Sequence, residues 1–213
     1  DRSFSYWTYF FYGGLSMPWW PIWLSSQGLS EVEIGDILAF ERIFIVVVSL
    51  IVAHYSDRTG HRRKILILFA VGMTGGYALF GAATVLWHFF AIAAFSAICR
   101  SPLIPLSDSI TMTHVRREEA EYGKVRLWGT ISFIIGSYAG GGILAYLSDD
   151  MILWGIVLSC AFVVVGFWVL PDTRSEGVAP HFTAGFRLAT RPIFILFVIT
   201  VALSMTSHTA VYV

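Results

Sequence analysis

Four ionisable side chains lie inside long apolar stretches of this sequence. Arg100 and Asp108 share one stretch, and Glu41 and Arg42 share another. A charged side chain inside a membrane-spanning helix costs several kcal/mol unless it is paired or wetted, so each of the four is a candidate functional residue. A guanidinium binds a carboxylate through two parallel hydrogen bonds. The sequence therefore indicates chemistry suited to binding a charged small molecule.

The partners of these four charges are open at the level of sequence. Arg100 could bind a carboxylate substrate, or it could be a structural partner of Asp108 or Glu41. For Asp108, a substrate contact or a structural pair is favoured over a side chain that snorkels to the interface. Glu41 and Arg42 lie near the outer end of their stretch, where snorkelling is an equal alternative. Because adjacent residues point about 100° apart on a helix, Glu41 and Arg42 need different partners.

The elements that carry these charges are predicted to be membrane-spanning helices. Of the 213 residues, 56% are hydrophobic and only 13% are charged, whereas a soluble domain has about 25% charged residues. Apolar runs of the length needed to cross a bilayer, about 20 residues, recur seven times. They are Phe4 to Leu24, Asp36 to Tyr55, Ile65 to Leu86, Phe89 to Thr113, Arg126 to Leu147, Met151 to Leu170 and Pro192 to Val213. We expect an all-α membrane protein, with the fourth helix bent by Pro102 and Pro105.

The distribution of basic residues predicts the orientation. Twelve of the fourteen Lys and Arg residues fall at the N-terminus or in the breaks 56–64, 114–126 and 171–191, and the breaks on the opposite side hold none. Basic segments remain in the cytoplasm, so we expect a cytoplasmic N-terminus in an inner membrane. Interfacial aromatic anchors are predicted near the outer ends at Trp19, Trp20, Trp87 and Trp154, and near an inner end at Trp168. The zero net charge gives no indication of nucleic acid binding, and no cofactor, metal site or enzyme motif is expected.

The longest break divides the predicted helices into six and one. Residues 1–170 are expected to form a six-helix bundle, 171–191 a cytoplasmic linker, and 192–213 the first helix of a second bundle. This arrangement is expected of a twelve-helix protein with two six-helix halves that is cut early in its second half, and a first residue other than Met suggests an N-terminus further upstream. On the fifth apolar run, the spacing of Ser132, Gly136 and Gly140 predicts close helix packing.

The turn after the second apolar run has the sequence DRTGHRR, residues 57–63. It resembles the G-x-x-x-D-R-x-G-R-R signature of major facilitator transporters, with Ala53 in place of the first glycine and His61 inserted. The resemblance assigns a gating role to this loop, which includes Asp57, Arg58, Gly60, Arg62 and Arg63.

A second resemblance is narrower. The segments SPLIPLSD at 101–108 and YGKVRLWG at 122–129 are similar to the phenyl propionate permease family and, more distantly, to lactose permease. The resemblance to lactose permease implies that Asp108 and Arg126 form a charge pair that binds substrate. It places Phe133 where lactose permease has a sugar-stacking tryptophan, and the loss of the indole donor makes lactose an improbable substrate.

Together these resemblances imply a secondary transporter in the lipid bilayer. The expected activity is proton symport of a small organic solute, an aromatic or other carboxylate rather than a sugar, by alternating access between two bundles. The alternative is a truncated, transporter-like subunit with a structural or assembly role, which would require a partner membrane subunit.

Overall fold

The computed structural model describes residues 2–59, 61–118 and 122–170, together with Pro192, Ile195, Leu196, Ile199 and Thr200. The chain divides into two units, Asp1–Glu176 and Gly177–Val213. In the second unit the described residues are helical, and the Thr200 hydroxyl donates to the carbonyl of Leu196 at 2.9 Å. The predicted linker 171–191 and most of 192–213 lie outside the described residues.

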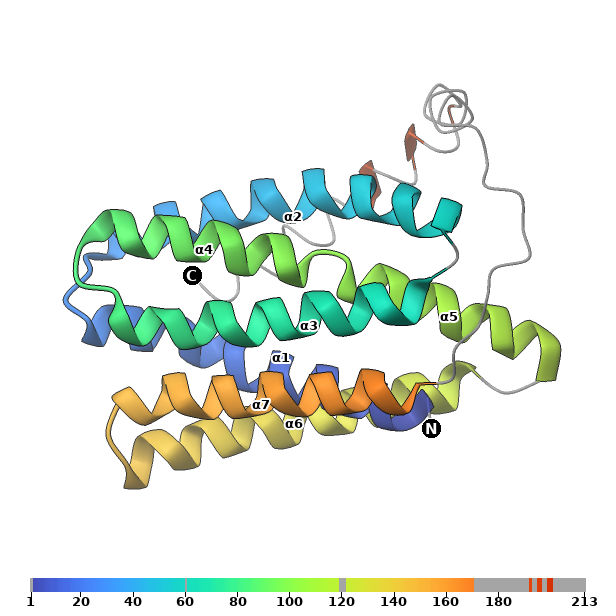
Figure 1. Ribbon diagram of the computed structural model, residues 1–213. Coiled ribbons are helices and arrows are strands. Elements are labelled where there is room, and N and C mark those ends of the chain that lie inside the picture. Colours follow the sequence, from blue (N-terminus) through green and yellow to red (C-terminus); the bar gives the residue numbers. More distant parts are fainter. Residues whose placement is uncertain are drawn as a thin grey trace. The chain divides into compact units, whose positions relative to one another are not determined.

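The described part of the first unit consists of helices joined by short turns, which confirms the predicted all-α class (Figure 1). The elements are α1 (Arg2–Ser26), α2 (Glu31–Thr59), α3 (Arg62–Leu79), the 3-10 turn η1 (Phe80–Ala82), α4 (Leu86–Arg100), α5 (Leu103–Glu118), α6 (Tyr122–Tyr146) and α7 (Asp150–Val169). Helices cover the ranges of the first six predicted spans, and the fourth range is divided between α4 and α5. Successive spans run in opposite directions (Figure 1), as the alternation of basic and non-basic breaks predicts.

Four segments of the described chain are long and apolar enough to cross a membrane: Arg62–Ala82, Leu86–Ile110, Arg126–Tyr146 and Asp150–Val169. Helices α1 and α2 are not among them. Helix α1 is rich in Trp and Tyr, whose side chains carry polar tips, and α2 contains Asp36, Glu41 and Arg42. Both helices nevertheless pack lengthwise in the same bundle (Figure 1).

Helix α2 begins with a capping box. The backbone N–H of Glu33 donates to the Ser30 hydroxyl at 3.3 Å, and the Ser30 backbone N–H donates to the Glu33 carboxylate at 2.8 Å. These reciprocal bonds satisfy donors that the first turn of a helix otherwise leaves without partners. Hydrogen bonds from the backbone and side chain of Ser30 also lower the pKa of Glu33. The capping bonds fix the N-terminal end of α2.

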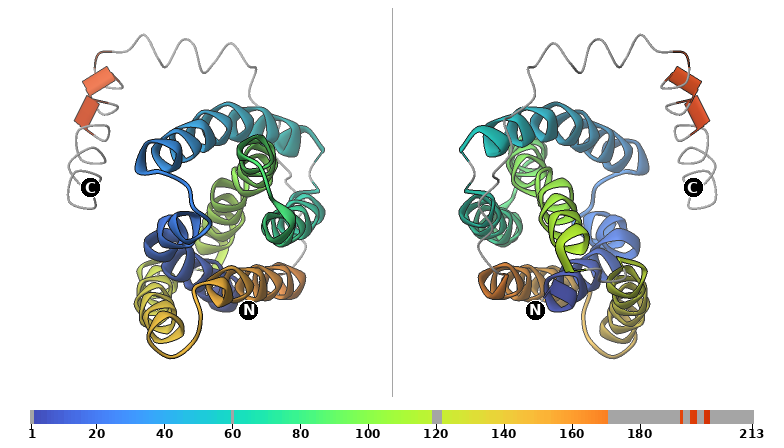
Figure 2. Two further views of the ribbon diagram at one scale, coloured as in Figure 1. Left: turned by 90° about the vertical axis from the view of Figure 1, so that its left-hand side faces the viewer. Right: turned by 90° about the vertical axis from the view of Figure 1, so that its right-hand side faces the viewer.

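The helix pairings reveal an internal repeat. Helix α1 packs against α6 and α7, α4 packs against α2 and α3, and α3 packs against α7 (Figure 2). If α4 and α5 are taken as one span, spans one, two and three can be exchanged with spans four, five and six. The pairing of α1 with α6 then becomes that of α4 with α2, and the pairing of α1 with α7 becomes that of α4 with α3. The pairing of α3 with α7 is unchanged. Repeats of three helices related in this way are a feature of transporter folds. The sequence did not reveal the repeat.

The fourth span is interrupted immediately after Arg100. Pro102 has no N–H to donate to the carbonyl of Ile98, and this carbonyl instead accepts from the Ser101 hydroxyl at 3.1 Å. The helix then restarts, since the N–H of Leu106 donates to the Pro102 carbonyl at 3.1 Å. The predicted bend is therefore confirmed as a break between two helices. Because the Ser101 hydroxyl replaces the missing backbone donor, the Ile98 carbonyl keeps a hydrogen bond at the break.

Helices α1 and α6 approach each other through glycine. A Cβ atom at Gly136 would overlap the carbonyl oxygen of Phe11, and a Cβ atom at Gly14 would overlap the carbonyl oxygen of Phe133. The Ser137 hydroxyl donates to the Gly14 carbonyl at 3.1 Å. Glycine at these positions allows backbone contact between the helices, which confirms the close packing predicted from the four-residue spacing.

An aromatic cluster fills the bundle near the C-terminal ends of α1 and α3. Trp20 stacks on Trp23 with ring centroids 5.0 Å apart, and it meets the edges of Tyr77 and Phe80 at 5.2 and 4.7 Å. Trp20 is 3% exposed, so the prediction that it is an interfacial anchor is wrong. Burial of a large aromatic surface outweighs placement at the interface here.

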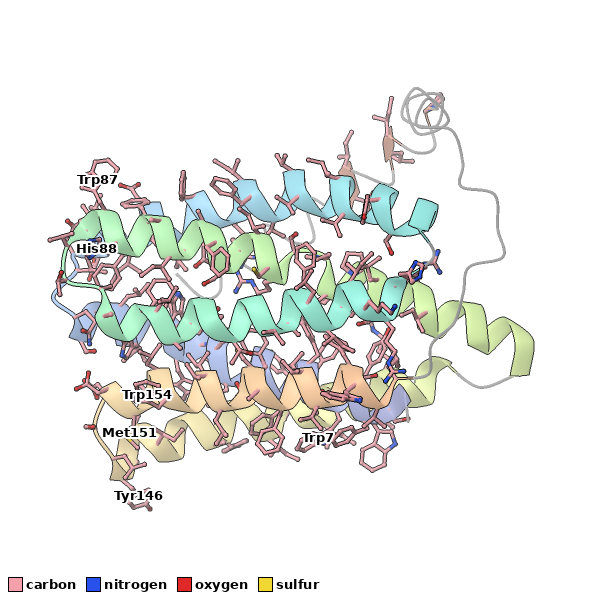
Figure 3. The ribbon with its side chains drawn as sticks, viewed as in Figure 1. Trp7, Trp87, His88, Tyr146, Met151 and Trp154 are labelled. Atoms are coloured by element: carbon pink, nitrogen blue, oxygen red, sulfur yellow. The ribbon has the colours of Figure 1, made fainter. Side chains whose placement is uncertain are left out.

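Of the four other tryptophans predicted as interfacial anchors, three are exposed and one is half-buried. Trp87 and Trp154 are exposed at one end of the bundle, together with Tyr146 (Figure 3), and Trp168 is exposed near the end of α7. Trp19 is half-buried, and its indole N–H donates to the carbonyl of Ser137 on α6 at 3.0 Å. Trp19 therefore links α1 to α6.

Candidate functional site

A buried ion pair joins α2 to the end of α4. The Nη2 of Arg100 lies 2.7 Å from the Oε2 of Glu41. The Glu41 side chain is 4% exposed, whereas the Arg100 side chain is 20% exposed. The pair is therefore largely buried, and the Arg100 side chain keeps a fifth of its surface exposed. The sequence left Asp108 and Glu41 as possible structural partners of Arg100, and in the structure Glu41 contacts Arg100.

Two tyrosines complete the environment of the guanidinium. The Nη1 of Arg100 donates to the hydroxyl oxygens of Tyr12 on α1 and Tyr77 on α3, at 3.5 and 3.3 Å. The two hydroxyl groups are 2.8 Å apart and form a hydrogen bond of their own. Four helices therefore contribute to one polar cluster, which we call the Arg100 cluster: Tyr12, Glu41, Tyr77 and Arg100.

Glu41 and Arg42 separate as the helical geometry predicts. Glu41 is buried in the Arg100 cluster, whereas Arg42 is exposed on the outside of α2. Snorkelling therefore remains the interpretation for Arg42, while burial excludes it for Glu41.

A second polar position lies between α1 and α5. The hydroxyl of Tyr6 donates to the Oδ1 of Asp108. A small pocket surrounds this contact, lined by Ser5, Tyr6, Tyr9, Phe10, Ile104, Ser107 and Asp108. The ring of Tyr9 lies 5.9 Å from that of Tyr12, so one aromatic side chain separates this pocket from the Arg100 cluster. Aromatic walls with a few polar groups are typical of small-molecule sites.

The two remaining predicted contacts lie on α6. Arg126 is exposed in the first part of α6, and its predicted pairing with Asp108 stays a prediction. Phe133 is half-buried, and its ring faces Gly13 of α1. Its predicted contact with substrate also stays a prediction.

The comparisons with known proteins decide the family. The model of the MFS_1 like family, a family of the major facilitator superfamily, matches residues 2–212. The chain belongs to this family. It is therefore a multi-pass membrane protein of a family of transporters, not of enzymes.

Curated relatives of this MFS_1 like chain carry the names of transport proteins. The chain is 30% identical over 178 residues to a "Probable 3-phenylpropionic acid transporter" of Escherichia coli, covering 83% of this chain and 47% of that protein. It is 27% identical over 207 residues to a maltose permease of Geobacillus stearothermophilus, covering 92% of this chain and 50% of that protein. The chain spans about half the length of these curated relatives.

A solved structure confirms the fold. The crystal structure of the nucleoside transporter NupG matches 99% of this MFS_1 like chain and 51% of its own chain, with a TM-score of 0.70 and 14% sequence identity. At this identity the likeness concerns the fold alone.

The major facilitator signature loop lies at the junction of α2 and α3. Gly60 and the side chains of Asp57 and Arg58 lie outside the described residues. Arg62 is buried at the start of α3, and the Arg63 guanidinium donates to the Trp168 carbonyl near the end of α7. A cation at a helix C-terminus is stabilised by the helix dipole. This contact ties the loop to the end of the sixth span.

Sequence reasoning missed the tyrosines of the site. Tyr6, Tyr9 and Tyr12 recur every three residues along α1, a spacing that places them on neighbouring parts of one helix face. This polar periodicity in an otherwise apolar helix was the available signal. Tyr77 has no comparable pattern, since its role depends on α3 meeting α1.

Proposed function

We propose that this chain forms the first bundle, and the start of the second, of a proton-coupled secondary transporter for small organic carboxylates. Alternating access between the two bundles would move the solute, with 171–191 as the cytoplasmic linker. The observation that carries the proposal is the ion pair of Arg100 and Glu41 inside a membrane bundle, in which the Arg100 side chain is 20% exposed. An intramembrane charge is expensive to maintain and marks substrate or ion pathways.

A carboxylate fits this site better than a neutral sugar does. The charge of Arg100 is balanced by a single carboxylate among the described residues, and Nη1 is held by neutral hydroxyls. Bidentate pairing with an anion uses the planar guanidinium fully. The aromatic side chains of the adjoining pocket, Tyr6, Tyr9 and Phe10, supply apolar walls for an aromatic ring. The relative named for 3-phenylpropionic acid supports this class, and 3-phenylpropionate is our test compound.

The first prediction concerns Arg100→Lys. We expect this change in the complete protein to raise the Kd for 3-phenylpropionate about 10- to 100-fold, because a point charge replaces a two-bond contact worth about 1.5–3 kcal/mol. Affinity and Tm should be measured on the same purified variants, with Arg174→Lys, in the predicted linker, as the control. A lower Tm with unchanged affinity would make Arg100 a purely structural partner of Glu41.

The second prediction concerns topology. We expect the N-terminus and the predicted linker to lie on the cytoplasmic side. The reason is that basic residues gather in these two segments and in the breaks 56–64 and 114–126, which are predicted to lie on the same side. Single cysteines placed at Ser3 and Ser175 should both react with a membrane-impermeant thiol reagent only when the cytoplasmic face is open to it. Labelling of the two positions from opposite faces would refute the topology.

A further inference from the structure

We propose that Glu41 binds the coupling proton, and that it does so when the carboxylate of the substrate replaces it on Arg100. The inference rests on the proposed carboxylate transport and specifies how the proton enters the same site. Its basis is the geometry of the Arg100 cluster, in which one guanidinium serves one buried carboxylate.

The two sides of the guanidinium are occupied differently. Nη2 carries the bond to Glu41, and Nη1 donates to Tyr12 and Tyr77. The tyrosine hydroxyls are neutral, and they can keep their positions by bonding to each other. An incoming carboxylate therefore competes with Glu41 for Arg100, because both are anionic acceptors for the same cation.

Displaced from Arg100, the Glu41 carboxylate has no comparable cation to move to among the described residues around the pair. The titratable groups around the pair are Tyr9 and Tyr12 from α1, Arg42 from α2, Tyr77 from α3, Asp108 from α5 and Cys160 from α7. Arg42 is the cation in this set, and it is exposed on another face of α2. A carboxylate buried without a counter-charge costs several kcal/mol, and it avoids that cost by taking up a proton.

The charges balance for one proton and one substrate anion. Before exchange, Arg100 and ionised Glu41 are neutral together. After exchange, Arg100 and the bound carboxylate are neutral together, and the proton taken from water resides on a carboxyl oxygen of Glu41. Substrate and proton would therefore enter the site in a ratio of one to one, and the loaded site carries no net charge.

The test counts protons during binding to the complete protein in detergent micelles. Titration calorimetry with 3-phenylpropionate, in two buffers with different ionisation enthalpies, should show uptake of about one proton per carboxylate. In the pH range where Glu41 is ionised in the free protein and protonated in the complex, each increase of one pH unit should raise the Kd about tenfold. The neutral analogue 3-phenylpropanamide, if it binds, should take up no proton.

Two variants locate the proton. Glu41→Gln should bind 3-phenylpropionate without proton uptake and with a Kd independent of pH. The control Asp36→Asn, an exposed carboxylate on the same helix, should behave as the unchanged protein. Uptake that persists in Glu41→Gln would overturn the assignment to Glu41.

If Glu41→Gln does not fold, proton uptake by the unchanged protein still tests the inference. Carboxylate binding without proton uptake overturns this inference and leaves carboxylate transport standing. Absence of carboxylate binding overturns the substrate class and this inference together.

Discussion

Replacing Arg100 with glutamine is expected to lower the free energy of unfolding by about 3 kcal/mol, because Glu41 would remain buried without its cation. The Glu41 side chain is 4% exposed and its bond to Arg100 is 2.7 Å long. The loss should be smaller at acidic pH, where Glu41 can take up a proton. Denaturant unfolding of the purified variants in detergent micelles, followed at two pH values, measures both effects.

A double variant distinguishes the cost of an unpaired buried charge from the cost of replacing the Arg100 side chain. Changing Glu41 and Arg100 together to methionine should recover most of the lost stability, since apolar replacements of a buried pair are often neutral. The matched control is Arg42→Gln, which removes an exposed charge from the neighbouring residue and should change the unfolding free energy by less than about 0.5 kcal/mol. If Arg100→Gln is as stable as this control, the ion pair contributes nothing to the fold.

The change Gly136→Ala is expected to destabilise the bundle by about 2 kcal/mol, because the added methyl group would overlap the backbone of α1. The obstacle is the carbonyl of Phe11, which cannot rotate away as a side chain can. Separating the helices would also lengthen the hydrogen bond between Ser137 and Gly14. Thermal unfolding in detergent micelles measures the loss.

Gly142→Ala is the matched control on the same helix. A Cβ atom at Gly142 meets open space, and alanine favours a helix over glycine by about 1 kcal/mol. This control should therefore be neutral or slightly stabilising. Equal Tm values for the two variants would show that α1 and α6 do not touch as closely as the structure indicates.

The number and order of the helices could be predicted from the sequence because the bilayer requires long apolar runs. Six predicted spans agree with the structure to within a few residues. The break in the fourth span was also predictable, since Pro102 removes a backbone donor whatever the surrounding fold. Such features depend on local composition, which a single sequence displays.

The partners of the buried charges were less predictable. The sequence offered both Glu41 and Asp108 as structural partners for Arg100, and it could not choose because the choice depends on how α2 and α5 pack around α4. The same applies to Tyr77, which reaches Arg100 because α3 packs against α4. Trp20 shows the opposite error, since position in the chain suggested the interface and packing placed it in the core.

The contact between the first and fifth spans constrains how the protein is made. Trp19 and Ser137 are 118 residues apart in the chain. At a synthesis rate of about 5–20 residues per second, α1 leaves the ribosome about 6–24 s before its partner on α6. During that interval the glycine face of α1 has no matching surface, because the helices made next, α2 and α3, do not replace α6. Helix α1 therefore reaches its final contacts only after α6 has been made, and we expect the insertion machinery to hold it until then.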